Sequence, residues 1–172
     1  MSNDYLEQEI TLHAKNSFIF LSLLIALLFN LLPLQETILL LRPDFVAITL
    51  LYWNINQPQR IGMTVSFVAG LIMDVSNSSI LGQHALAYCL LTFFAMILHR
   101  RLRLFNIFQQ APQIFWMLLF VQFVVFLTGM LGGTYFPDWY YFFPSATGAL
   151  IWPIISFILS IPQKPKSDPD EL

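Results

Sequence analysis

Residues 61–98 read IGMTVSFVAGLIMDVSNSSILGQHALAYCLLTFFAMIL. Two apolar stretches, 61–75 and 80–98, flank a short polar turn, and the pair contains one charged residue, Asp74. A helix that crosses a bilayer needs ~20 mainly apolar residues, within a range of about 17–25. The Asn-Ser-Ser sequence at 77–79 suits a turn and the N-cap of the second helix. We therefore predict two membrane-spanning helices joined by this turn.

The composition of the whole chain supports a lipid environment. Of its 172 residues, 57% are apolar and 10% are charged. Globular domains average roughly 45–50% apolar and about 25% charged residues, because a small domain exposes much of its surface to water. The low charge excludes a soluble enzyme, a disordered chain and a basic nucleic-acid-binding protein. The single cysteine, Cys89, excludes an intramolecular disulfide and a cysteine-rich metal site.

The same hydropathy criterion predicts an all-α integral membrane protein, built as a compact bundle of six transmembrane helices. The predicted spans are 17–32, 43–55, 61–75, 80–98, 111–131 and 145–161. Pro43 suits the first turn of the second span, and Asp44 suits the positive end of its dipole. Pro112 likewise suits the first turn of the fifth span. A cytoplasmic tail, 1–16, and a disordered cytoplasmic tail, 162–172, flank the bundle.

The basic residues predict the orientation of these spans. Six spans place both termini, the second–third loop and the fourth–fifth loop on one side. That side carries seven of the eight Lys and Arg residues, namely Lys15, Arg60, Arg100, Arg101, Arg103, Lys164 and Lys166. The positive-inside rule makes it the cytoplasmic side and leaves Arg42 on the other. The cytoplasmic basic cluster of Arg100, Arg101 and Arg103 is interpreted as a topology determinant, or alternatively as a site for a partner or anionic headgroups.

A stripe of small residues runs along the third predicted span. Gly62, Ser66 and Gly70 are spaced four residues apart, and Asp74 is the next position in the series. Small residues at this spacing let membrane helices pack closely, so we interpret the three as a helix-packing stripe. A carboxylate at membrane depth is costly and usually faces protein or a cavity. Asp74 lies roughly 18 Å along the helix from Gly62, which places it in the outer half of the bilayer.

Polar residues from four predicted spans converge on the same depth. This polar cluster consists of Asn30, Arg42, Asp44, Asp74, Gln83 and His84. One interpretation is a structural network, with Arg42 paired to Asp74 or Asp44. The other is a pocket or lateral contact for a ligand or for a partner's transmembrane helix. Gln122, midway along the fifth span, is a lone polar residue that suits a hydrogen bond to another helix.

Sequence motifs of catalysis are missing from the chain. The phosphate-binding, dinucleotide-binding, zinc-protease and nucleophile-elbow patterns do not occur in it. The three histidines, His13, His84 and His99, do not have the spacing of metal ligands. We therefore expect a protein that is not an enzyme and that uses no cofactor or metal.

Several short stretches in this order resemble one bacterial family. Residues 41–53 read LRPDFVAITLLYW, residues 58–60 read PQR, residues 70–74 read GLIMD, and residues 81–82 read LG. Together with the chain length and six-span hydropathy, they resemble the rod shape-determining MreD family over roughly 17–160. The resemblance implies structural or partner-binding roles for Arg42, Pro43, Asp44, Asp74 and Gly82. Gln83 and His84 join these candidates because they lie at the same depth.

The resemblance also implies a function. MreD proteins belong to the inner-membrane machinery of elongation, the elongasome, which inserts lateral-wall peptidoglycan and sets cell shape. The implied partners are MreC directly, and MreB, RodA and its transpeptidase within the complex. The implied fold is similar to the substrate-binding S subunits of energy-coupling-factor transporters. The leading hypothesis is a non-enzymatic scaffold surrounded by membrane lipids, and the alternative is a small-molecule or lipid-binding membrane subunit of a transporter.

Overall fold

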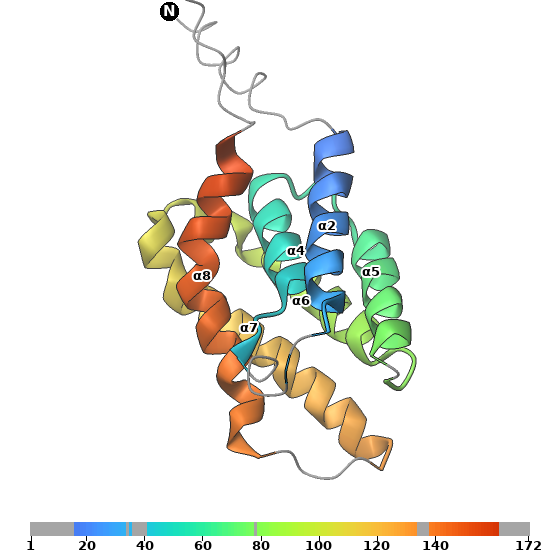
Figure 1. The fold of residues 1–172 in the computed structure, drawn as a ribbon. Coiled ribbons are helices and arrows are strands. Elements are labelled where there is room, and N and C mark those ends of the chain that lie inside the picture. Colours follow the sequence, from blue (N-terminus) through green and yellow to red (C-terminus); the bar gives the residue numbers. More distant parts are fainter. Residues whose placement is uncertain (1–15, 34, 36–40, 78, 134–137, 162–172) are drawn as a thin grey trace, which may run out of the picture.

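The computed structural model describes residues 16–33, 35, 41–77, 79–133 and 138–161. Over these residues the chain is helical throughout, which confirms the predicted all-α class (Figure 1). The helices are α2 (Asn16–Leu31), α4 (Phe45–Asn56), α5 (Met63–Ser76), α6 (Gln83–Arg103), α7 (Ile107–Leu131), the 3-10 helix η1 (Trp139–Phe142) and α8 (Phe143–Ser160). The predicted tails, apart from residue 16, lie outside the described residues.

Helix α4 forms the centre of the bundle. Its ten consecutive residues 46–55 are all buried, and Trp53 is among the largest fully buried side chains. Helices α2, α6 and α8 pack against it, and Figure 1 shows it between α2 and α8. A helix that is mainly apolar on all faces is typical of a protein core or a membrane span, and the burial of α4 shows that it lies in the core. Helices α2, α6 and α8 therefore provide most of the protein that encloses α4.

The outer helices expose large apolar side chains, in contrast to α4. Phe20 on α2 is 61% exposed, Trp116 on α7 is 65% exposed and Leu150 on α8 is 77% exposed. A water-soluble monomer rarely exposes contiguous apolar surface on this scale, whereas a protein in lipid does. Three helical segments, Gln83–Arg103, Ile107–Leu131 and Trp139–Ser160, are long and apolar enough to cross a membrane. Helices α2, α4 and α5 are apolar but shorter, with 16, 12 and 14 residues.

The predicted start of the second span was wrong by two residues. Pro43 and Asp44 precede α4, which begins at Phe45. Asp44 has an extended backbone and is the N-cap, because its side chain accepts a hydrogen bond from Ala47 N. A carboxylate in that position satisfies an amide that has no partner inside the helix. Asp44 therefore stabilises the helix from outside its first turn.

Other helix starts also differ from the prediction, including those of α5 at Met63 and α8 at Phe143, each by two residues. Helix α6 begins at Gln83 rather than residue 80, and its N-cap is Gly82 rather than the 77–79 turn. Helix α7 begins at Ile107, so Pro112 lies inside the helix rather than in its first turn. Transmembrane helices tolerate an internal proline when neighbouring groups satisfy the freed carbonyl. The C-cap of α7 at Gly132 agrees with the predicted end.

Candidate functional site

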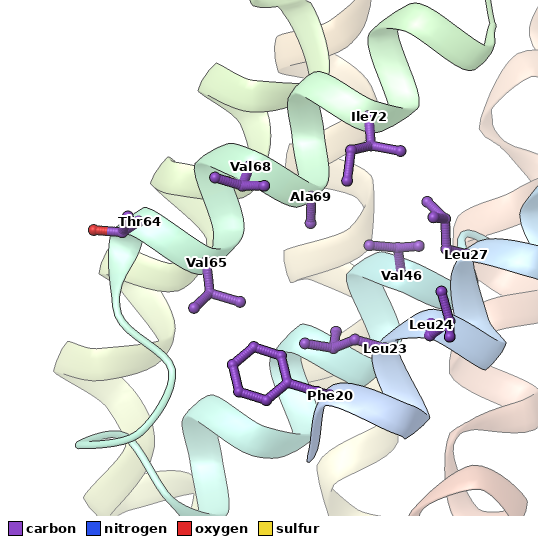
Figure 2. A pocket seen from close by; sticks show the side chains of 10 residues that line it. All are labelled: Phe20, Leu23, Leu24, Leu27, Val46, Thr64, Val65, Val68, Ala69 and Ile72. Atoms are coloured by element: carbon purple, nitrogen blue, oxygen red, sulfur yellow. The ribbon is translucent and has the colours of Figure 1, made fainter. Parts of the chain in front are cut away.

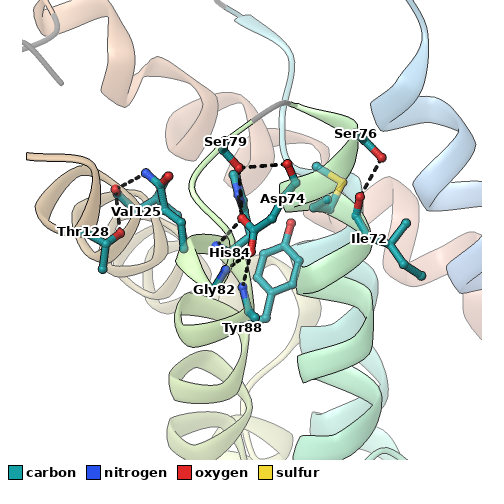
Figure 3. Close-up of polar contacts among 12 residues, drawn as sticks. Ile72, Asp74, Ser76, Ser79, Gly82, His84, Tyr88, Val125 and Thr128 are labelled. Carbon is teal, nitrogen blue, oxygen red and sulfur yellow. Dashed lines mark hydrogen bonds and ion pairs between the residues drawn. The ribbon is translucent and has the colours of Figure 1, made fainter. Parts of the chain in front are cut away.

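The carboxylate of Asp74 lies at the junction of α5 and α6 and is completely buried (Figure 3). Its Oδ2 accepts hydrogen bonds from Gly82 N at 2.8 Å and from Ala85 N at 3.4 Å. Its Oδ1 accepts from His84 N and His84 Nδ1, both at 2.8 Å, and from Ser79 Oγ at 3.0 Å. Amides at a helix start have no partner within the helix. Asp74 of α5 therefore caps the N-terminus of α6.

Small residues on α5 allow this close approach of α6. A Cβ on Gly70 would lie 2.3 Å from the Cα of Ala85, so only glycine fits there. One turn earlier, buried Ser66 Oγ lies 2.5 Å from Thr92 Oγ1 of α6. Gly62 is the N-cap of α5, and nothing lies within 4 Å of a Cβ built on it. The stripe thus faces α6 at Ser66 and Gly70 but not at Gly62.

The turn before α6 explains why a glycine precedes the helix. Gly82 has φ +98°, a left-handed conformation that other L-residues rarely adopt. In this conformation its N–H points at the Asp74 carboxylate. A Cβ at this position would meet no other atom within 4 Å, so backbone conformation is what favours glycine here.

The second carboxylate, Asp44, joins three helices at the same end of the bundle. Its Oδ1 accepts from Ala47 N at 3.0 Å and from Asn30 Nδ2 of α2 at 2.9 Å. Its Oδ2 accepts from the hydroxyl of Tyr88 on α6 at 2.6 Å. The Asn30 side-chain oxygen in turn accepts from Phe45 N at 3.1 Å. Hydrogen bonds to an ionised group are the strong ones, so this network fixes α2, α4 and α6 together.

The predicted pairing of Arg42 with a carboxylate was wrong. Arg42 donates through Nη1 to the carbonyl of Leu32 at 3.1 Å. Among the described residues, the ion-pair contact is the 2.8 Å one between His84 Nδ1 and Asp74. Both carboxylates are already bonded to backbone amides and to other side chains, whereas Arg42 is half-buried at the edge of the cluster. The side chain of Gln83 bonds to α7 and not to either carboxylate, since its Nε2 donates to Val125 O at 2.5 Å.

A pocket of about 280 Å³ adjoins this network. Its walls come from α2, the segment before α4, α5, α6, α7, η1 and the start of α8. Arg42, Pro43, Asp44 and His84 line it together with Gln122 of α7. Gln83 and Gly82 are not among the lining residues, and Asp74 lies behind His84. We call this space the polar pocket.

Comparison with known proteins assigns the chain to a family. The model of the family described as rod shape-determining protein MreD matches residues 14–161. The chain belongs to the MreD family. The curated rod shape-determining protein MreD of Haemophilus influenzae is 25% identical over 135 residues, which cover 78% of this chain and 83% of that protein. No solved structure matches the chain. Family membership and the three long apolar helices together make this a rod shape-determining membrane protein.

The opposite end of this MreD-family bundle is basic. Arg103 Nε donates to Ile55 O at 2.6 Å, and its Nη2 donates to Asn56 O, so it caps the C-terminus of α4. Arg60 Nη1 donates to Asn16 Oδ1 at the start of α2 at 2.6 Å. Arg100 and Arg101 are exposed in the last turn of α6. The four arginines predicted to share one side therefore lie at one end of the bundle, away from Arg42.

Sequence reasoning missed two buried residues that organise the MreD-family fold. Tyr88 is fully buried and reaches Asp44, and its position four residues after His84 on one helix face was a usable signal. Gln110 of α7 donates to the carbonyls of Leu102 and Phe105, both at 3.0 Å, and accepts from Trp152 Nε1 at 3.2 Å. No sequence pattern marks Gln110, because its partners come from the last turn of α6, the turn that follows it and α8, which are far apart in the sequence or were not predicted.

The described part of the chain contains no group of three His, Cys, Asp or Glu side chains that could hold a metal ion. In the cluster itself, the oxygens of Asp44 and Asp74 accept hydrogen bonds from several donors. Such bonds hold helices in fixed relative positions. This arrangement suits a rigid bundle end that presents a binding surface.

Proposed function

We propose that the chain is a non-enzymatic, multi-pass scaffold of the bacterial inner membrane. It binds MreC and, within the elongasome, works with MreB, RodA and its transpeptidase to organise lateral-wall peptidoglycan synthesis. Membership of a rod shape-determining family supports the role in cell shape. The proposal includes six membrane spans, both termini in the cytoplasm, and a bundle similar to the S subunits of energy-coupling-factor transporters.

The arrangement of the short helices supports six spans. The start of α2 and the end of α8 lie at the same end of the bundle in Figure 1. The basic end carries Arg60, Arg100, Arg101 and Arg103, as expected for the cytoplasmic side. Helix α4, at 12 residues, is roughly 18 Å long and falls short of an approximately 30 Å hydrocarbon core. Because α4 is enclosed by protein, its length does not need to match the lipid.

The observation that carries partner binding is an apolar groove of about 330 Å³ between α2 and α5 (Figure 2). Val46 of α4 forms its floor, and leucines and Phe20 of α2 face Val65, Val68 and Ile72 of α5. Thr64 is the one polar residue among its ten lining residues. We call this the α2–α5 groove.

The groove suits a single transmembrane helix of MreC. Phe20 and Val68, on opposite walls, are 61% and 49% exposed, so a helix between them would contact both. Membrane helices associate through close packing, and small residues at the contact let backbones approach. Ala69 supplies such a position on the α5 wall. In contrast to the polar pocket, the α2–α5 groove can bind a partner through complementary shape and apolar contact, with almost no hydrogen bonding.

Substitution of Ala69 tests the proposal. Ala69→Trp should fill the groove and reduce co-purification of MreC by about tenfold or more, which corresponds to about 1.4 kcal/mol of lost binding free energy. Cells carrying the variant should lose their rod shape. The measurement is affinity purification from membranes in mild detergent, with MreC quantified against the tagged chain.

A matched control uses another apolar groove on the molecule. Ala146 lines a groove formed by aromatic side chains of α7, η1 and α8, and Ala146→Trp adds the same bulk there. This control should retain MreC. If Ala69→Trp keeps its thermal unfolding midpoint, binds MreC normally and supports rod-shaped cells, the α2–α5 groove is not the docking site. Failure of the wild-type chain to recover MreC would reject partner binding altogether.

The polar pocket favours a second candidate, a small-molecule or lipid-binding membrane subunit of a transporter. Charged and polar residues converge there in a space of about 280 Å³, close to the lower size of ligand pockets. The same purification separates the two candidates. Recovery of an ATPase module without MreC would support the transporter, whereas recovery of MreC and MreB would support the scaffold.

A further inference from the structure

The polar pocket contains hydrogen-bond acceptors that the bundle does not use. Gln122 Oε1 is buried and has no hydrogen-bond partner among the described residues. His84 bonds through Nδ1 to a carboxylate, which can only accept, so Nδ1 carries a proton, and in the neutral imidazole Nε2 then offers a lone pair. Asp44 accepts three hydrogen bonds, and a carboxylate has about four acceptor sites. A ligand in this pocket must therefore be rich in N–H or O–H donors.

Among the described residues that line the same pocket, Arg42 is the one Lys or Arg side chain. Arg42 has five N–H donors, and among the described residues it uses Nη1 for the carbonyl of Leu32. The pocket thus presents acceptors from Asp44, His84 and Gln122, together with a guanidinium. Guanidinium groups bind phosphate in preference to neutral groups. This combination suits a ligand in which a cation with several N–H donors lies next to a phosphate. The cation of the ligand then balances the charge of Asp44, and its phosphate balances the charge of Arg42.

The remaining walls indicate that the ligand is a membrane lipid. Val121 and Val125 line the pocket from α7, which is long and apolar enough to span a membrane. At about 280 Å³ the pocket can hold a headgroup but not acyl chains as well. Tyr140 of η1, another lining residue, is 52% exposed, so the pocket opens at the surface of the bundle, where acyl chains can continue into the bilayer.

We infer that the polar pocket binds the headgroup of a phospholipid that carries a primary amine, namely phosphatidylethanolamine. Its ammonium has three N–H donors for Asp44, Gln122 Oε1 and His84 Nε2, and its phosphate faces Arg42. Phosphatidylcholine has a quaternary nitrogen without donors, and phosphatidylglycerol has no positive charge. Phosphatidylcholine therefore leaves the acceptors without donors, and phosphatidylglycerol offers hydroxyl donors but no cation to balance the charge of Asp44. This inference concerns a lipid site and does not depend on MreC binding.

Native mass spectrometry of the full chain in detergent tests this site. The delipidated protein is titrated with phosphatidylethanolamine, phosphatidylcholine or phosphatidylglycerol that carry identical acyl chains. Phosphatidylethanolamine should bind about tenfold more tightly than either other lipid, as expected for a hydrogen bond between charged and polar groups in a buried site. Gln122→Leu should reduce that ratio of affinities about tenfold, because it deletes one acceptor and changes the size of the side chain little.

Gln113 provides a matched control on the same helix. Its Oε1 is also buried and has no partner in the part of the chain that the structure describes, but Gln113 does not line the polar pocket. Gln113→Leu should leave the lipid preference unchanged, and both variants should keep the wild-type thermal unfolding midpoint. Equal binding of the three lipids, a preference for phosphatidylglycerol, or an unchanged preference in Gln122→Leu would overturn the inference. If soluble phosphoethanolamine bound as tightly as the lipid, the conclusion that the ligand comes from the membrane would be rejected.

Discussion

The two ends of the bundle stabilise the same helices by different means. Helices α4 and α6 both begin at the end that contains the polar cluster, where Asp44 and Asp74 cap them. They both finish at the basic end, where Arg103 of α6 reaches the last carbonyls of α4. Both arrangements place charge favourably for the helix dipole. The ends differ in burial, since Asp74 is completely buried and Arg103 is exposed.

This difference in burial suggests two roles for the charged residues. Buried charges stabilise the structure, whereas exposed charges set the orientation in the membrane. A buried hydrogen bond is costly to lose, because the remaining group has no water to replace its partner. An exposed charge can be replaced by solvent and is screened by salt. We therefore expect the polar-cluster end to fix the geometry of the bundle and of its pocket. The basic end should mainly determine which side of the membrane it faces.

Replacing Asp74 should produce the largest effect. Asp74→Leu leaves the amides of Gly82 and His84 without partners and removes the contact of the His84 ring. Breaking such a buried, charge-assisted network should lower the free energy of unfolding by about 3–5 kcal/mol. Unfolding in detergent micelles by titration with a denaturing surfactant measures this loss.

Asp138 is the matched control for this substitution. It is an exposed aspartate that precedes η1 and makes no side-chain capping bond. Asp138→Leu should change the unfolding free energy by less than about 0.5 kcal/mol, as do most surface substitutions. If Asp74→Leu were as stable as Asp138→Leu, the polar-cluster end would not fix the bundle.

The sequence predicted which residues gather at this end, for a physical reason. A carboxylate at membrane depth needs partners, so Asp74, Asp44, Asn30 and His84 could be placed together from their depths alone. The structure brings Asp74 to His84 and Asp44 to Asn30. Depth does not determine which donor lies within 3 Å, however. The choice of Arg42 as the partner followed from its charge, whereas the amides that occupy the carboxylates have no sequence signature.

Helix starts explain most of the remaining differences. The capping role of Asp74 depends on α6 beginning at Gln83, and the apolar residues at 80–81 had suggested an earlier start. Pro112 suggested a late start for α7, because proline is favoured in a first turn and disfavoured inside a soluble helix. Family resemblance identified Gly82 but not its left-handed backbone. Such features depend on tertiary contacts that one sequence does not display.

Gly70 tests how closely the two helices of the polar-cluster end must approach. In Gly70→Ala the new Cβ meets backbone atoms of His84 and Ala85 at 2.3–2.7 Å, and backbone cannot rotate away as a side chain can. The helices must separate, and overpacking of this kind costs about 1–3 kcal/mol. Gly62→Ala is the control, because its Cβ has nothing within 4 Å. Equal unfolding free energies for the two variants would show that the α5–α6 contact adapts freely.

Arg103 should give the smallest effect and thereby complete the comparison of the two ends. Arg103→Ala removes the bonds to Ile55 O and Asn56 O, but water can reach these carbonyls at an exposed helix end. The unfolding free energy should fall by about 0.3–1 kcal/mol, the usual value of a cation at a helix C-terminus. Arg101→Ala, in the same turn, should change it less, because Arg101 makes no hydrogen bond to α4 among the described residues. A loss for Arg103→Ala as large as that for Asp74→Leu would mean that burial does not distinguish the two ends.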